Sequence, residues 1–118
     1  MKLNHINLTV TDVQEASDFL VKYFAMQNRG GNKGMGFLTD EVDGWGFVLS
    51  LMKAAKDTQA KYPGTFHIGF FIENKESVDD LNLRLRQDGF DVPVPEDTGH
   101  SYGFYVEAPG GFTVEVGA

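Results

Sequence analysis

Hydrophobic and polar residues alternate in several short runs along this chain, a pattern typical of strands with one covered face. In the first run, residues 3–10, the apolar face consists of Ile6, Leu8 and Val10. His5 lies on the opposite face with Asn7 and Thr9, because strand side chains point alternately to the two faces. Similar runs predict further strands over residues 35–39, 45–52, 65–72, 104–107 and 112–116, the last two flanking the tight turn 108–111.

Two other segments have the spacing of helices packed on a sheet. Asp12 is the predicted N-cap of the first helix, with Glu15 completing a capping box. Its apolar stripe is Ala16, Phe19, Leu20, Tyr23 and Phe24. The second helix is predicted over residues 75–88, with Gly89 ending it and with the apolar stripe Val78, Leu81 and Leu85.

The two halves of the chain repeat one another. A shift of 62 residues superposes His5 on His67, and a shift of 65 superposes residues 46–50 on 111–115, so the second half carries a short insertion. Each half is read as β-α-β-β-β, with the strand after each helix expected near residues 26–30 and 90–94, the second broken by Pro93 and Pro95. We therefore predict one α+β domain of two tandem βαβββ modules, residues 1–53 and 65–118, joined by a linker over 54–64.

Composition limits the classes of function. The chain has 118 residues, enough for one domain, and no cysteine, which excludes disulfides and thiolate metal sites. Its start lacks a signal-peptide pattern, and no apolar run reaches the ~20 residues of a membrane span. The expectation is a cytoplasmic protein without a membrane partner. A formal net charge of −7 argues against nucleic acid and is compatible with a small, even cationic, ligand.

Three potential metal ligands lie on strand faces of the same orientation. His5, His67 and Glu115 all lie on strand faces turned away from the predicted helices. If the two sheets curve together, these side chains line one concavity, and two imidazoles with one carboxylate suit Fe(II), Zn, Mn, Co or Ni. Each residue alone also has a simpler interpretation: an exposed His5, a core His67 and a solvated Glu115.

The chain resembles the vicinal oxygen chelate superfamily, which includes glyoxalase I, extradiol dioxygenases, fosfomycin-resistance enzymes and bleomycin-binding proteins. The resemblance rests on His-Ile-Asn-Leu-Thr-Val at residues 5–10, His-Ile-Gly-Phe at 67–70, and the ending from Tyr105 to Glu115, which is similar to aromatic-x-x-Asp-Pro-x-Gly-x-x-x-Glu. The resemblance implies that His5, His67 and Glu115 bind a divalent metal ion. It also implies that Tyr105 is a catalytic acid or a hydrogen-bond donor beside the metal.

Departures from the family narrow this interpretation. Ser50 stands where glyoxalase I has a second glutamate, and no Lys or Arg follows Arg86, which disfavours a fosfomycin-modifying enzyme. His100 is a second candidate acid or base, although an exposed loop residue is the simpler expectation.

Two functions follow from the resemblance, and a scaffold or regulatory domain with a vestigial site is a third interpretation. The leading one is a metal-dependent lyase or dioxygenase that acts on a small molecule with vicinal oxygens. The alternative is a metal-free binding protein of the bleomycin-resistance type, which sequesters a cationic compound in an aromatic, acidic groove. Family members commonly complete the site across a two-fold axis, so a homodimer is expected.

Overall fold

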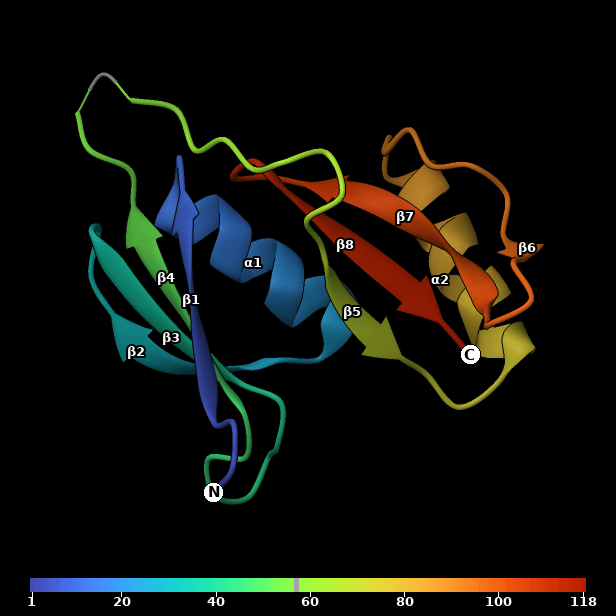
Figure 1. The fold of residues 1–118 in the computed structure, drawn as a ribbon, viewed down its shortest axis with the longest axis horizontal. Helices are drawn as coiled ribbons and strands as arrows, with labels where there is room; N and C mark the ends of the chain where they lie inside the picture. The colour runs from blue at the N-terminus through green and yellow to red at the C-terminus, as the bar shows by residue number, and fades with distance from the viewer. Residues whose placement is uncertain (57) are drawn as a thin grey trace. The chain divides into compact units, whose positions relative to one another are not determined.

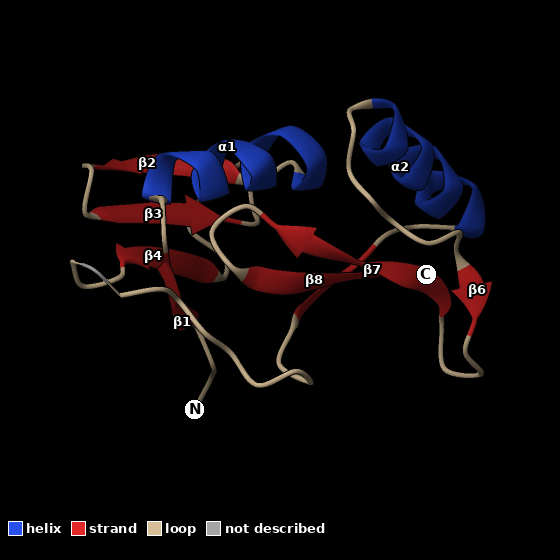
Figure 2. Ribbon diagram, turned by 90° about the horizontal axis from the view of Figure 1, so that it is seen from above, coloured by secondary structure: helices blue, strands red, loops and turns tan. Residues whose placement is uncertain are grey.

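The computed structural model of the protein describes residues 1–56 and 58–118. The chain forms two compact units, residues 1–62 with 108–112 and residues 63–107 with 113–118. The element order β-α-β-β-β occurs twice, as the sequence predicts (Figure 1). Figure 2 shows the two helices in blue and the strands in red.

The first unit is built on a four-stranded mixed sheet. Its elements are β1 (His5–Val10), α1 (Val13–Phe24), β2 (Gln27–Gly31), β3 (Met35–Thr39) and β4 (Val48–Lys53). The strand order is β1-β4-β3-β2, with β1 parallel to β4 and the other neighbours antiparallel. The predicted N-cap is confirmed, because the Asp12 carboxylate accepts a hydrogen bond from the Glu15 amide at 2.9 Å. The apolar stripe of α1 is buried except for Phe24, which is half-buried, whereas His5, Asn7 and Thr9 are exposed.

The second unit repeats this order. Its elements are β5 (Ile68–Phe71), α2 (Lys75–Gln87), β6 (Glu96–Asp97), β7 (Tyr102–Ala108) and β8 (Phe112–Gly117), and its sheet has the order β5-β8-β7-β6. Asn74 caps α2 by accepting a hydrogen bond from the Ser77 amide. Buried residues of α2 and the sheet form the apolar core of this unit: Val78, Leu81, Leu85, Phe104, Val106, Val114 and Val116.

Strand register confirms the internal duplication residue by residue. Ile6 pairs with Leu49 in the first sheet, and Ile68 pairs with Val114 in the second. The same two shifts of 62 and 65 residues connect these pairs. The next pairs along are therefore equivalent as well: Asn7 with Ser50 in the first sheet corresponds to Gly69 with Glu115 in the second.

The strand after the second helix was predicted in the wrong place. Residues 90–94 are not a strand, and β6 is only two residues long and begins at Glu96. Pro93 and Pro95 explain the difference, because proline has no amide hydrogen to donate to a sheet. The predicted linker has no helix or strand in its described residues, and its residue 57 lies outside them.

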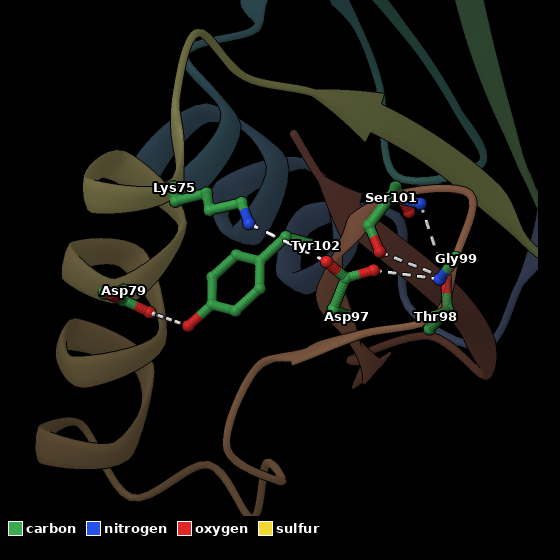
Figure 3. Close-up of polar contacts among 7 residues, drawn as sticks. All are labelled: Lys75, Asp79, Asp97, Thr98, Gly99, Ser101 and Tyr102. Atoms are coloured by element: carbon green, nitrogen blue, oxygen red, sulfur yellow. Dashed lines mark hydrogen bonds and ion pairs between the residues drawn. The ribbon is translucent and has the colours of Figure 1, made fainter.

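Side-chain contacts connect the short β6 region with the start of α2 (Figure 3). Lys75 Nζ lies 3.7 Å from Asp97 Oδ2, and the Tyr102 hydroxyl donates to Asp79 Oδ1 at 2.6 Å. The Asp79 hydrogen bond, then desolvation and the Asp79 charge, raise the Tyr102 pKa above 10.0. Within the described part of the chain, no helix is long and apolar enough to cross a membrane.

Candidate functional site

The second sheet has one face whose side chains point away from the buried core of its unit, and we call it the second open face. Strand register divides it into rows. Gly69 pairs with Glu115, and Phe71 with Gly117, across β5 and β8. Tyr102 and Ala118 exchange two backbone hydrogen bonds at 3.0 Å, so counting three residues inward along β7 and β8 places Tyr105 opposite Glu115.

Two of the predicted metal ligands are in contact on this face. His67, immediately before β5, points its Nε2 at Glu115 Oε2 on β8, and the two atoms are 3.1 Å apart. His67 Nδ1 lies 3.0 Å from the Thr65 carbonyl oxygen, which accepts a hydrogen bond and therefore assigns the proton to Nδ1. In neutral His67 the Nε2 lone pair then faces a carboxylate oxygen. This contact is favourable only if a second proton or a cation lies between the two atoms.

The pair fits a divalent metal ion. Two neighbouring ligands at about 2.1 Å are separated by about 3.0 Å on an octahedral ion and by about 3.4 Å on tetrahedral Zn²⁺, and the 3.1 Å observed between His67 and Glu115 lies within this range. Metal-bound histidines usually donate their other ring N–H to a carbonyl or carboxylate, as His67 does to Thr65. The chemistry and spacing of these two side chains therefore suit metal binding.

Tyr105 completes this polar group. Its ring stands edge-on to His67, with centroids 5.3 Å apart, and its hydroxyl lies close enough to the Glu115 carboxylate for that group to affect the Tyr105 pKa. Desolvation, followed by the negative charge and the hydrogen bond of Glu115, raises the Tyr105 pKa above its usual value. The phenol is therefore protonated at neutral pH and available as a donor.

Another carboxylate on the same face is differently engaged. Glu107 Oε1 accepts a hydrogen bond of 2.8 Å from the Thr113 hydroxyl, one row from Glu115. In the first unit, the position on β4 that corresponds to Glu115 is Ser50, which has no carboxylate. The Ser50 hydroxyl donates a hydrogen bond to Asn7 Oδ1 at 2.8 Å. The hydroxyl of Ser50 is thus already committed within its own sheet.

His5 lies in the first unit, at the start of β1. Its side chain is exposed, and its Nδ1 is 2.7 Å from Asn4 Oδ1, which leaves Nε2 as the acceptor nitrogen. In neither unit, taken by itself over its described residues, do three His, Asp or Glu side chains gather as a metal site. The three-ligand set of His5, His67 and Glu115 remains a prediction.

Several features of the site were not predicted from the sequence. The contact of Thr65 with His67 uses a backbone carbonyl, which leaves no signal in residue type. The hydrogen bond between Ser50 and Asn7 also requires knowledge of the strand register. His100, the second candidate acid or base, is exposed in the loop before β7.

A cavity in the structure lies away from His67, Glu115 and Tyr105. A cavity of about 430 Å³ lies in the first unit at the start of α1, where its lining includes Asp12, Ser17 and Lys53. None of the predicted site residues lines it. Asp12 already caps α1 there. Because the predicted residues His67, Glu115 and Tyr105 lie elsewhere, we place the candidate site on the second open face.

Comparison with known proteins identifies the family of this fold. A sequence model described as Glyoxalase/Bleomycin resistance protein/Dioxygenase superfamily matches residues 2–116. Among solved structures, a possible glyoxalase from Bacillus cereus is 47% identical, with a TM-score of 0.87 and coverage of 100% of this chain and 99% of the other. A comparison with curated proteins found no match.

More distant structures share the fold. The genomically encoded fosfomycin resistance protein of Listeria monocytogenes is 21% identical, with a TM-score of 0.78, covering 100% of this chain and 93% of that one. Lactoylglutathione lyase from Agrobacterium tumefaciens is also 21% identical, with a TM-score of 0.73 and coverage of 98% and 92%. At this identity the two structures support the fold alone.

Proposed function

Because the chain belongs to the Glyoxalase/Bleomycin resistance protein/Dioxygenase superfamily, we propose that it is a small metal-dependent enzyme. Its substrate is a small molecule with two neighbouring oxygen atoms, and the reaction is that of a lyase or a dioxygenase. His5, His67 and Glu115 hold the divalent ion, which is Fe, Zn, Mn, Co or Ni. Ser50, in place of a fourth ligand, leaves coordination positions for the substrate.

One observation carries this proposal: the Nε2 atom of His67 faces Glu115 Oε2 at 3.1 Å while its Nδ1 is held by the Thr65 carbonyl. A histidine fixed in this tautomer next to a carboxylate is prepared to bind a cation. The relative from Bacillus cereus, described as a possible glyoxalase, supports a function in the same family.

Each side chain has a defined part in the proposed chemistry. A divalent ion bound here supplies Lewis acidity toward a substrate oxygen. Glu115 offsets the positive charge, and the Thr65 carbonyl keeps the His67 ring in one tautomer and orientation. Tyr105 is the proposed catalytic residue, because its hydroxyl lies beside Glu115 and can donate a hydrogen bond or proton to a substrate oxygen.

A second candidate function is a metal-free binding protein. The exposed aromatic rings of the second open face favour it, since Tyr105 is 46% and Phe71 75% exposed. Together with the net charge of −7, these rings suit the binding of a cationic ligand on an aromatic surface. In this function His67 and Glu115 form a plain hydrogen-bonded ion pair.

Thermal melting with and without metal distinguishes the two functions. The protein is melted with a chelator and then with Fe(II), Mn, Co, Ni or Zn, and a metalloenzyme should melt higher with at least one ion, because only the folded state assembles the ligands. His67→Ala should lose this rise, and His100→Ala, which removes an exposed histidine outside the site, should keep it. If no ion raises the melting temperature of the wild type, the binding protein is the better description.

A further inference from the structure

The second open face also suggests which substrate the site accepts. We propose that Phe71, together with Gly69 and Gly117, forms an apolar subsite for a planar apolar substituent that is attached next to the substrate's vicinal oxygens. This inference rests on the proposed function, because it uses the His67–Glu115 pair as the point where the oxygens bind.

Gly69 places no side chain between His67 and Phe71 on this face. His67, Gly69 and Phe71 follow one another on the same face of the β5 segment, so His67 and Phe71 are about 13 Å apart along the strand. A Cβ atom added to Gly69 would lie 3.6 Å from Glu115 Oε2. The missing side chain therefore leaves room directly beside the carboxylate, on the side that leads to Phe71.

Gly117 allows the Phe71 ring to lie over β8. A Cβ atom added to Gly117 would stand 3.2 Å from Phe71 Cε1 and 3.3 Å from Ser101 Oγ. The ring thus rests on bare backbone in the row next to Glu115, and 75% of Phe71 remains exposed. An aromatic ring supported on one side and open on the other is a surface on which a second planar group can stack.

The surroundings of Phe71 favour a small ligand over a protein partner. The same face carries His67, Glu107 and Glu115, and a large protein interface would have to remove water from these ionisable groups at a high cost. A small molecule can cover the ring while its oxygens meet the polar pair, which is the usual arrangement of apolar surface and few polar groups in ligand sites.

Two hydroxamates provide matched probes. Acetohydroxamate and benzohydroxamate carry the same pair of neighbouring oxygens and differ in a methyl or a phenyl group. Their dissociation constants are measured by calorimetry on the metal-loaded protein, with elemental analysis to verify that the metal stays bound. We expect benzohydroxamate to bind the wild type about threefold to tenfold more tightly, as one aromatic contact allows.

Variants locate the source of this preference. Phe71→Ala should abolish the preference and leave acetohydroxamate binding and metal content unchanged. Leu83→Ala removes another exposed apolar side chain, on α2, and should change neither affinity. Gly69→Ala should weaken benzohydroxamate selectively by placing a methyl group between the polar pair and Phe71, and the added atom makes only an ordinary contact of 3.6 Å, so folding is preserved.

The outcomes separate the subsite from the site. Equal affinities for both probes in the wild type, or a preference that survives Phe71→Ala, would overturn the apolar subsite while the metal site stands. If neither hydroxamate binds the metal-loaded protein, or no metal binds at all, the proposed function fails and the subsite fails with it.

Discussion

Replacing Glu115 with glutamine separates the role of its charge from the role of its shape. In the metal-free protein, Glu115 and His67 are 25% and 37% exposed in their side chains, so their interaction is screened by water and contributes at most about 1 kcal/mol. Glutamine keeps the size and can still accept the hydrogen bond from Tyr105. The unfolding free energy of the metal-free protein should therefore change by less than about 1 kcal/mol.

With metal the change should be much larger. At a metal concentration one hundred times the dissociation constant, binding adds about 2.7 kcal/mol of stability. Changes to residues beside a metal ligand already cost about 10-fold to 100-fold in metal affinity, so removing the charged ligand itself should weaken binding at least about 100-fold, and the gain then falls to about 0.4 kcal/mol or less. For a chain of 118 residues, these gains raise the melting temperature by about 10 °C and about 2 °C respectively.

The assay is differential scanning calorimetry of wild type and Glu115→Gln, each with chelator and with the best-binding ion. Glu107→Gln is the matched control, because Glu107 is a carboxylate on the same face that is engaged with Thr113 instead of His67. The control should keep the full metal-dependent rise. Equal rises for wild type and Glu115→Gln would refute the assignment of Glu115 as a metal ligand.

Four further predictions test other parts of the structure. Ser50→Ala should leave metal content near that of the wild type, because its hydroxyl already bonds Asn7; a loss of metal as large as in His67→Ala would show that Ser50 is a ligand. Sedimentation at micromolar concentration should find a homodimer, since outer strands such as β2 have unpaired backbone groups in the sheet order, and a monomer would contradict this. The hydrogen bond to Asp79 raises the Tyr102 pKa, so the folded state holds this proton more tightly than the unfolded state, and the resulting stability is present below pH 10.0 and lost as the pH rises above it. Tyr102→Phe should reduce the alkaline fall in unfolding free energy, and an unchanged fall would count against the contact. Unfolding should occur in one transition, because the tip of the β7–β8 hairpin belongs to one unit and the rest of it to the other, whereas two separate transitions would disprove a single domain.

Much of the fold follows from local patterns. Alternation located the strands that carry the site, and the predicted cap Asp12 lies where α1 begins. The duplication was readable because equivalent strands keep the same face toward the core. The position of the strand after α2 was not predicted in the same way. β6 forms beyond Pro95, at Glu96, where backbone amides are available again.

The candidate site was only partly predictable. Parity placed His67 and Glu115 on one face, and their contact confirms that they lie together. Thr65 acts through its backbone carbonyl, and Gly69 acts through the absence of a side chain. Neither role could be predicted from the residue type. Tyr105 was named from resemblance to a family, and the register of β7 against β8 then explains its position opposite Glu115.

The metal content of the protein decides whether His5, His67 and Glu115 form a metal site. Protein purified without chelators or affinity-tag metals is loaded, dialysed and measured by elemental analysis, alongside His5→Ala, His67→Ala and Ser50→Ala. We predict one equivalent of one divalent metal per chain in the wild type and in Ser50→Ala, and a strong loss in both histidine variants. Wild-type protein without stoichiometric metal, or a His5→Ala variant that retains it in full, would contradict the three-ligand site.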